Sequence, residues 1–489
     1  MKKLFIIIIG VIALGSCKKL DLAPESNLTA ATYYKTPADA QAAIGACYGQ
    51  ITTIYGASDG FMFIDLATTD DGVPFLSGVG DRVPLWQYKI TPSNTFINMF
   101  SNSYAAIQKS NIVIARVPLI EMDANLKQQY VAEAKYLRAL HYFNLLRLYG
   151  GVPVVTDESL SLEGLDKPKN TVDEVYNQIE QDLKDAEVLP VTYAAADKGR
   201  ATRGAAKGLL AKVYLTRAGT TVGSPYWALA AAKAKEVIDI GTTGVYDLWA
   251  NYADAFSLAN KGGKEYVFEI QYKTDILGNG LGRLYGVRSA PIYIGGGAGT
   301  ARVSATLYNS FVTGDRRRDV NFLSSYTFGG TVFPLSVTDA DPTKAVAFNK
   351  LWDQTATLGT GNGKSFPYMR YSEILLIYAE ALNEAGNGPN AEAYNAFKRV
   401  HDRAGLTTPA LGVYNYLSFK QAVWLERRLE FPFEMQRRFD LVRTGRLIDA
   451  VKSEVAFGRA PEIQPYHYLL PIPQGVLTAS PALVQNPGY

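Results

Sequence analysis

The sequence predicts a mostly helical fold, in which a scaffold of tetratricopeptide-like helical repeats carries a large, loop-rich insertion over one face. Two observations support this: long segments with apolar residues at helical spacing, and two helical pairs separated by the glycine-rich stretch 261–367. Hydrophobic residues make up 47% of the 489 residues and charged residues 19%, which is typical of a folded globular protein. The formal net charge of +3 is too small and too evenly spread to predict nucleic-acid binding.

The first 17 residues have the pattern of a bacterial lipoprotein signal peptide. Lys2 and Lys3 precede the apolar run Leu4–Leu14, which is too short to span a bilayer in the mature protein. The run ends in Leu-Gly-Ser-Cys, which resembles a lipobox, so we expect Cys17 to carry acyl chains such as palmitate. The alternative is an ordinary secretory peptide with a coincidental cysteine. Once Cys17 is modified, Cys47 has no disulfide partner, and we expect it to be a buried small residue.

Two helices are expected before the central part of the chain. The first runs from Pro37 to about Tyr55, because Thr36 is a good N-cap and proline is favoured in the first helical position. The second runs from Asn98 to about Val117.

The segment 56–92 between these helices is irregular. It contains glycines, prolines and acidic residues, together with Trp86 and Tyr88. Long segments without regular structure inside a compact chain are usually functional. We therefore consider this segment a candidate ligand-binding region.

The stretch Val131–Val155 is the centre of the expected fold. Leu137, Leu140 and Leu148 recur near the helical period, and aromatic residues widen the apolar stripe. Two glycines at 150–151 should end the helix, because glycine adopts the left-handed conformation of a C-cap without a Cβ penalty. The prolines and valines that follow favour an extended exit.

Two helical pairs follow, each about as long as a tetratricopeptide repeat. In each pair, small residues stand where antiparallel helices would touch closely. The expected helices are Arg203–Arg217, Tyr226–Ile240, Tyr371–Ala385 and Pro389–Arg403.

The stretch 261–367 breaks the helical pattern and is rich in Gly, Tyr, Phe, Ser and Thr. Within it, Glu265–Tyr272 alternates like a short strand. We expect this stretch to cover one face of the helical scaffold.

The last long helical segment is expected over Ser418–Leu447. Pro432 should kink it, because proline removes a backbone donor. Helical spacing places Glu434 near Arg438, and Arg437 near Asp440, so these opposite charges should meet on the surface.

Five stretches of the sequence resemble the SusD/RagB family, so the resemblance spans nearly the whole chain. These are YAAIQKSNIVIARV at 104–117, RALHYFNLLRLYGGVPVV at 138–155, RATRGAAKGLLAKVYL at 200–215, YSEILLIYAEALNEAG at 371–386, and ERRLEFPFEMQRRFDLVRTGR at 426–446 with the tail at 468–489. The chain departs from the family pattern at the start of the second helix and in the last long helical segment, where Pro432 is unusual. Phe96 and Phe100 stand where the family often has tryptophan, and Met435 stands where it usually has glycine.

This resemblance implies an outer-membrane nutrient-binding lipoprotein of Bacteroidetes, anchored by its lipid and facing the cell exterior. Its partner would be a TonB-dependent transporter of the SusC type, over which it forms a lid, and its ligand an oligosaccharide. A peptide ligand, as in the RagB branch, is the alternative. The implied organisation is the signal peptide 1–17 and a single domain, 18–489. That domain comprises an N-terminal helical part, 18–260, a ligand-side insertion, 261–367, and C-terminal helices with an extended tail, 368–489.

The motifs that could carry catalysis lack their structural context. Gly56–Gly60 fits GxSxG, but no strand is expected before the serine and no helix after it. The three histidines show no zinc-binding spacing. Asp70 and Asp71 could be the carboxylates of a glycoside hydrolase, but adjacent residues seldom face each other across a sugar bond. We expect a solvated turn or a ligand contact there, and no enzyme activity, metal or cofactor.

The ligand site is expected on two loop-rich stretches, 65–94 and 277–300. A sugar ring stacks its C–H face on aromatic rings, and its hydroxyls need amide, carboxylate or guanidinium partners. For Trp86, the alternative is a core position, because large aromatic residues also dominate protein cores. The residues that meet these requirements are Trp86, Tyr88, Asp71, Arg82, Asn94, Tyr285, Arg288 and Tyr293.

Overall fold

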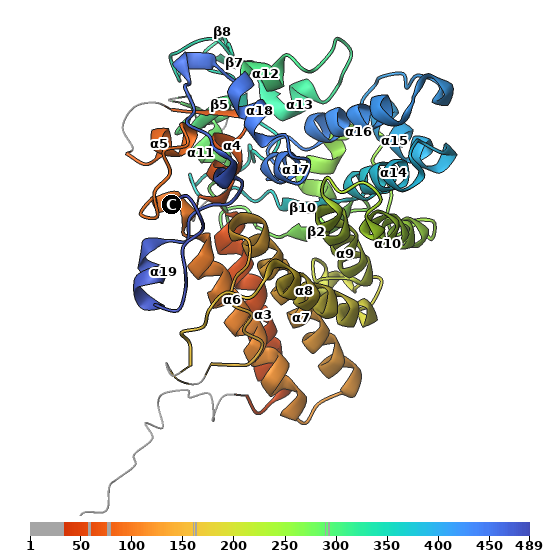
Figure 1. Ribbon diagram of the computed structural model, residues 1–489. Coiled ribbons are helices and arrows are strands. Elements are labelled where there is room, and N and C mark those ends of the chain that lie inside the picture. The colour runs from red at the N-terminus through yellow and green to blue at the C-terminus, as the bar shows by residue number, and fades with distance from the viewer. Residues whose placement is uncertain are drawn as a thin grey trace, which may run out of the picture.

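The computed structural model describes residues 34–56, 60–75, 80–159, 161, 164–288, 290–291 and 294–489. Cys17 and Tyr293, two of the predicted functional residues, lie outside this part of the chain. Long helices stack against one another, and most of the short strands and small helices gather at one end of them (Figure 1). The mostly helical fold class is therefore confirmed. None of the described helices combines the length and apolar character needed to cross a membrane.

Four helices form the first layer around the central stretch. Thr36 caps the first of them, with its side chain accepting from the backbone N–H of Asp39, as predicted. Cys47 on the same helix is buried, which confirms the expectation for it. The four helices are α3 (Pro37–Tyr55), α6 (Met99–Arg116), α7 (Ala124–Tyr149) and α8 (Val172–Asp185).

Helix α7 is central, and every residue of it from Tyr136 to Tyr149 is buried. Its arginines are buried with partners: Arg138 donates to both carboxylate oxygens of Asp182, at 2.7 and 2.8 Å. The helix ends at Gly150, whose φ is 75°, so the predicted stop is confirmed.

The C-terminal tail closes the end of α7. The N–H of Leu470 donates to the carbonyl of Leu148 at 2.7 Å, and Nδ2 of Asn486 donates to that of Tyr149 at 3.0 Å. These bonds satisfy carbonyl groups that have no partner inside the helix.

The two predicted helical pairs are present and lie side by side. Helix α10 packs against α14, so the pairs are neighbours although the insertion separates them in the sequence (Figure 1). Close packing requires glycine at Gly208, where a Cβ would come within 2.7 Å of Met369 Sδ and 2.9 Å of Ile374 Cδ1. The helices are α9 (Arg203–Ala218), α10 (Pro225–Gly241), α14 (Tyr371–Gly386), α15 (Ala391–Arg403) and α16 (Tyr416–Glu430).

Strand pairs connect the insertion to the helical scaffold. Strand β2 (Tyr266–Ile270), predicted from alternation, pairs antiparallel with β10 (Phe366–Arg370), so the two ends of the insertion meet. Strand β1 (Gly72–Pro74) pairs antiparallel with β5 (Ala301–Val303). The second pair places the two predicted ligand stretches next to each other.

The remaining described elements are short. The strands are β3 (Val287–Arg288), β4 (Gly296–Gly297), β6 (Phe322–Leu323), β7 (Ser325–Phe328), β8 (Thr331–Pro334) and β9 (Ala347–Phe348). The helices are α4 (Phe61–Ala67), α5 (Arg82–Trp86), α11 (Leu281–Tyr285), α12 (Ala305–Tyr308), α13 (Arg318–Asn321), α17 (Arg437–Arg443), α18 (Leu447–Ser453), α19 (Gln474–Ala479) and the 3-10 turn η1 (Thr95–Ile97).

The predicted kinked helix over Ser418–Leu447 is wrong, because the chain leaves helical geometry altogether around Pro432. Helix α16 ends at Glu430 and α17 begins only at Arg437. Between them, Phe433 and Met435 have φ values of 62° and 54°, in the left-handed region that favours glycine. Glycine would adopt the backbone of Met435 without this strain.

The predicted surface ion pairs in this segment are also wrong. With the helix interrupted, Glu434 turns inward and accepts from Arg370 at 2.8 Å. Arg438 is 1% exposed and donates to the carbonyl of His467, and Arg437 binds Asp70 at 2.8 Å. The charges are therefore structural and buried.

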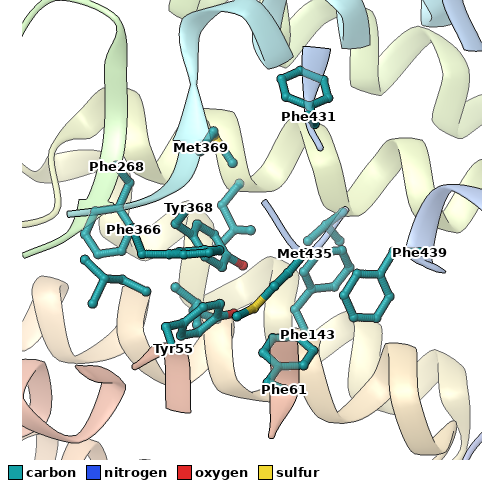
Figure 2. Close-up of a cluster of buried hydrophobic side chains, with 14 of the residues drawn as sticks. Tyr55, Phe61, Phe143, Phe268, Phe366, Tyr368, Met369, Phe431, Met435 and Phe439 are labelled. Atoms are coloured by element: carbon teal, nitrogen blue, oxygen red, sulfur yellow. The ribbon is translucent and has the colours of Figure 1, made fainter. Parts of the chain in front are cut away.

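Aromatic side chains from distant segments meet in the core (Figure 2). Tyr55 at the end of α3 lies 5.3 Å from the ring of Phe61 and 5.0 Å from that of Phe366. The side chain of Met435 points into this cluster beside Tyr55 (Figure 2). The interrupted segment therefore contributes the Met435 side chain to the core, although its backbone has an unfavourable positive φ.

This conflict predicts an unusual order of stability for two variants. Met435→Ala should lower the free energy of unfolding by about 2–5 kcal/mol, because the lost side chain is 3% exposed. Met435→Gly should be about 1 kcal/mol less harmful than alanine, because glycine accepts the positive φ. Urea unfolding followed by circular dichroism measures both.

The matched control is Leu140 in the middle of α7, which is 0% exposed. There, glycine should be about 1 kcal/mol worse than alanine, as in any helix interior. The same order at Met435 would contradict the strain argument.

Candidate functional site

A cleft of about 430 Å³ lies where the two predicted ligand stretches meet the ends of two long helices. The end of α3, the start of α6, the turn η1, and the short helices α4, α5 and α11 supply its walls. Its lining residues are Thr53, Gly60, Phe63, Arg82, Thr95, Phe96, Asn98, Asn102, Leu284, Tyr285 and Thr300. We refer to it as the Arg82 cleft.

Aromatic rings form the apolar part of this cleft. The rings of Phe63 and Phe96 lie 4.6 Å apart and are tilted by 32°, and Phe96 is only partly buried. Tyr285 is 2% exposed and packs edge-on against Phe433 at 5.1 Å. Phe96 therefore offers the ring face that a ligand can reach most readily.

Gly60 allows Phe96 to take this position. Its φ is 83°, and a Cβ there would lie 2.7 Å from Cδ1 of Phe96. Any other residue would strain the backbone and displace the ring.

Arg82 supplies hydrogen-bond donors. It is the first residue of α5, and its guanidinium carbon lies 5.7 Å from the centre of the Phe63 ring. Its Nε is buried without a hydrogen-bond partner among the described residues. Burial lowers the pKa of Arg82; Tyr285 acts in the opposite direction, and Arg288 lowers it further.

Thr300 adds a second unused polar group. Its side chain is 4% exposed, and its Oγ1 has no partner in the described part of the chain. Buried polar atoms are normally satisfied, so two such atoms in one cleft indicate a place for ligand oxygens.

Of the predicted residues, Arg82 and Tyr285 therefore lie in one cleft. Arg288 lies close enough to influence Arg82, but its own guanidinium covers the ring of Phe75 at 4.3 Å. Tyr293 is outside the described residues.

The structure places Trp86 in the core, which is the alternative that the sequence left open. Trp86 is 1% exposed and lies beneath the guanidinium of Arg459, 5.1 Å away. Tyr88 is 2% exposed, and its hydroxyl donates to the carbonyl of Thr68 at 2.5 Å. Neither ring has a face open to a ligand.

Asp71 and Asn94 also have structural roles here. Oδ1 of Asp71 accepts from Arg428 at 2.9 Å. Asn94 caps η1, since its Oδ1 accepts from the N–H of Phe96 at 3.0 Å. These side chains hold the loops that carry the cleft.

The solvated turn or ligand contact expected at Asp70 and Asp71 is wrong, because both residues are buried and bound to arginines. Asp70 accepts two bonds from Arg437, each 2.8 Å long, and pairs with Arg428 at 2.9 Å. Burial alone would raise the pKa of Asp70, but the two arginines outweigh it and lower the pKa to about 2. Carboxylates neutralised in this way are not placed for glycoside hydrolysis.

Several cleft residues were not singled out from the sequence: Thr53, Phe63, Asn98, Asn102 and Thr300. Phe96 had been noted only for the resemblance at the start of the second helix, and not as a ligand contact. Among the described residues, no group of three or more His, Cys, Asp or Glu side chains could hold a metal ion.

A larger groove of about 690 Å³ lies between α6, the chain after α7, and α19. Its lining is mostly apolar, and two of its amide side chains are hydrogen-bonded within the protein. Gln108 binds the backbone of Ser159 at both ends, at 3.0 and 3.1 Å, and Asn111 donates to Val155 O at 3.0 Å. The bonds of Gln108 and Asn111 join α6 to the chain after α7 and so form one wall of the groove.

Comparisons with known proteins agree with this architecture. The family model described as "SusD family" matches residues 342–489, and the one described as "Starch-binding associating with outer membrane" matches residues 70–215. The SusD-like protein P2 of Formosa agariphila is 30% identical to this chain, covering 99% of the chain and 98% of the relative.

Solved structures show the same fold. A laminarin-binding SusD-like protein superposes with a TM-score of 0.78 at 27% identity, covering 93% of this chain and 100% of that one. A SusD homologue from Bacteroides thetaiotaomicron superposes with a TM-score of 0.79 at 25% identity, covering 94% and 98%.

The fold is a stack of helical repeats, and its loops form a cleft with polar and aromatic side chains. These features place the chain in the class of helical-repeat binding proteins. The chain belongs to the SusD/RagB family, a family of non-catalytic binding proteins associated with the outer membrane. This membership, rather than any absence in the structure, assigns the chain to the binding proteins.

Proposed function

We propose that this protein captures oligosaccharides at the cell surface, binds them in the Arg82 cleft and delivers them to a SusC-like TonB-dependent transporter. A relative of the same fold is named for binding laminarin, and one matching family model is named for binding starch. Both names point to glucans as the first ligands to test.

The observation that carries this proposal is the composition of the cleft. Phe96 is partly exposed, and Arg82 and Thr300, each with one unpartnered polar atom among the described residues, line the same cavity. Sugars need both an apolar surface for a ring face and fixed polar groups for their hydroxyls.

A peptide is the competing ligand, because the same polar groups could bind backbone amides. A binding panel separates the two. It should contain laminarihexaose, maltohexaose, xylohexaose and mannohexaose, with mixed peptides of similar length. If at least one sugar binds and no peptide does, the proposal is supported. If a peptide binds and no sugar does, the peptide-binding alternative is favoured.

The transporter partnership can be tested by co-purification. The tagged protein, extracted from its native membrane in mild detergent, should retain a TonB-dependent barrel of the SusC type. Recovery of the protein without any such barrel would contradict the delivery role.

We further propose that acyl chains on Cys17 anchor the protein to the outer membrane. Cys17→Ser should abolish acyl labelling and move the protein out of the outer-membrane fraction, because the thiol is the attachment point. Metabolic labelling with a fatty-acid probe and membrane fractionation measure this. The control is Ser16→Ala, which preserves a small residue before the cleavage site. Normal labelling of Cys17→Ser would refute the anchor.

A further inference from the structure

Two further cavities share Glu269, the fourth residue of β2, as a lining residue. One, of about 470 Å³, lies between β2 and the segments around 191–202 and 243–246. The other, of about 400 Å³, lies between β2, α3 and residues 196–200. Lys198, Gly199, Arg200, Phe268 and Glu269 line both, and none of them lines the Arg82 cleft. We refer to the two cavities together as the Glu269 cleft.

Glu269 has an unused hydrogen-bond acceptor. Its side chain is 3% exposed; Oε1 accepts from Nε2 of Gln271 at 2.9 Å, and Oε2 has no partner in the described part of the chain. Burial raises the pKa of Glu269 to about 7, although Lys261, Gln271 and the N–H of Gly262 favour its charged form. Glu269 lines both cavities, and buried carboxylate oxygens are normally hydrogen-bonded, so a donor on a ligand in the cleft would satisfy Oε2.

Two glycines on α3 leave the wall of this cleft open. Gly45 and Gly49 lie one helical turn apart, and a Cβ at either position would meet no atom within 4 Å. Glycine in a helix interior is less stable than alanine, and no neighbour in the described chain requires it here. The exposed backbone leaves room for a flat ligand against the helix.

We propose that the Glu269 cleft is a second sugar-binding site, which takes a neutral hexose or pentose residue of an oligosaccharide. The ligand must bring a hydrogen-bond donor to Oε2. An ammonium group would be repelled by Lys198 and Lys261, and an anion would bring no hydrogen-bond donor to Oε2. A sugar hydroxyl donates without a charge, and the partly exposed rings of Tyr48 and Tyr193 offer apolar faces for the ring.

The inference rests on the proposed function only in taking a glycan as the ligand. Two sites on one chain would hold a polymer more firmly than either alone, because the second contact forms at a high effective concentration.

Two variants test the site without removing structure that the fold needs. Glu269→Leu keeps the approximate shape and removes the acceptor and the buried charge. Gly49→Leu places a side chain in open space on a helix and fills the cleft. The control is Gly386→Leu, on α14, where a Cβ also meets nothing within 4 Å. Calorimetry with laminarihexaose, maltohexaose, xylohexaose and mannohexaose counts the sites.

We expect two sites in the unmodified protein for at least one of these sugars. Glu269→Leu and Gly49→Leu should each weaken one of them by about tenfold or more. Arg82→Ala should weaken the other, and Gly386→Leu should change neither. Thermal unfolding should show all four variants folded.

The remaining outcomes are decisive. A single site that is lost in Arg82→Ala and intact in Gly49→Leu would overturn the second site while leaving the proposed function standing. If no sugar binds at all, both the second site and the proposed function are overturned. The same holds if peptides bind and Gly49→Leu abolishes that binding.

Discussion

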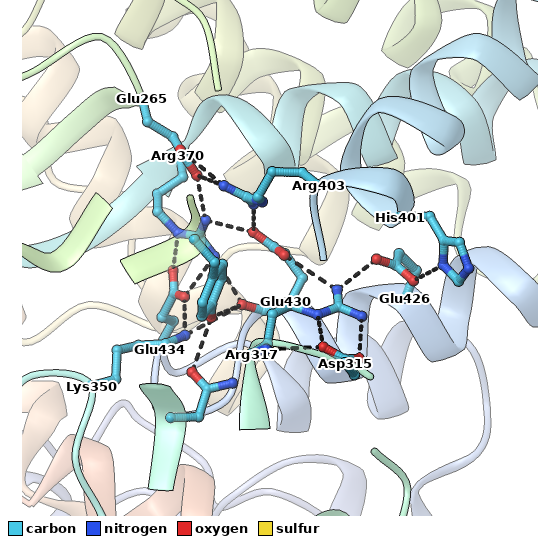
Figure 3. A network of polar contacts seen from close by, with 12 residues as sticks. Glu265, Asp315, Arg317, Lys350, Arg370, His401, Arg403, Glu426, Glu430 and Glu434 are labelled. Carbon is cyan, nitrogen blue, oxygen red and sulfur yellow. Dashed lines mark hydrogen bonds and ion pairs between the residues drawn. The ribbon is translucent and has the colours of Figure 1, made fainter. Parts of the chain in front are cut away.

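Arg370→Ala is expected to lower the free energy of unfolding by about 3–5 kcal/mol or more, because it removes one partner from a buried ion cluster. The Arg370 side chain is 0% exposed and pairs with Glu265 at 2.7 Å, Glu430 at 2.6 Å and Glu434 at 2.8 Å (Figure 3). Without the guanidinium, these carboxylates would share the remaining cations in a medium of low polarity.

This cluster joins parts of the chain that are distant in sequence. Arg370 lies at the end of β10, Glu430 at the end of α16, and Arg403 at the end of α15 (Figure 3). Burial lowers the pKa of Arg370, but the surrounding carboxylates outweigh it and hold the pKa well above its usual value. The charged members of the cluster are Glu265, Asp315, Arg317, Lys350, Arg370, Arg403, Glu426, Glu430 and Glu434.

Guanidinium unfolding followed by tryptophan fluorescence measures the effect. The control is Lys398→Ala, which breaks an exposed pair with Asp402 and should cost no more than about 1 kcal/mol. Arg370→Lys retains the charge but not the fork of donors, so it should fall between the two. A stability of Arg370→Ala within about 1 kcal/mol of the unmodified protein would contradict the role given to the cluster.

Arg82→Ala is expected to weaken oligosaccharide binding in the Arg82 cleft by about 10- to 100-fold, the value of a hydrogen bond from a charged donor. Its unfolding temperature should change little, because Arg82 is only partly buried and forms no ion pair among the described residues. Calorimetry with the sugar that binds best in the panel measures the affinity. The control is Arg318→Ala, a partly exposed arginine outside the cleft that pairs with Asp319.

Phe96→Ala provides an independent test of the same cleft. It should weaken binding by removing the open ring face, whereas Trp86→Ala should lower stability by about 3–5 kcal/mol because Trp86 is 1% exposed. Unchanged affinity in both Arg82→Ala and Phe96→Ala would refute the site. Loss of binding in a fully stable Trp86→Ala variant would restore Trp86 as a ligand contact.

The structure brings the two predicted stretches together, but it places the residues singled out on them in different environments. Irregular composition marked the stretches, and β1 and β5 bring them together. Trp86 and Phe96 are both aromatic residues near a loop, and only their neighbours distinguish them. Arg459, far along the chain, covers Trp86, whereas Gly60 holds Phe96 at the edge of the cleft.

The sequence by itself determined the helical class, the central helix with its stop at Gly150, and the repeat pairs. These features follow from hydrophobic period, caps and glycine conformations, which act between residues one or two helical turns apart. Residues this close in sequence are necessarily close in space.

Only the tertiary structure decided the partners of the charged residues and the exposure of the aromatic ones. Asp70 binds Arg437, 367 positions away, and Glu434 binds Arg370, 64 positions away. A carboxylate in water and one buried against an arginine have the same sequence signature, because the difference is made by desolvation and by a charge that another segment supplies. Whether an aromatic side chain lies in the core or in the cleft also depends on contacts with segments that are distant in the sequence.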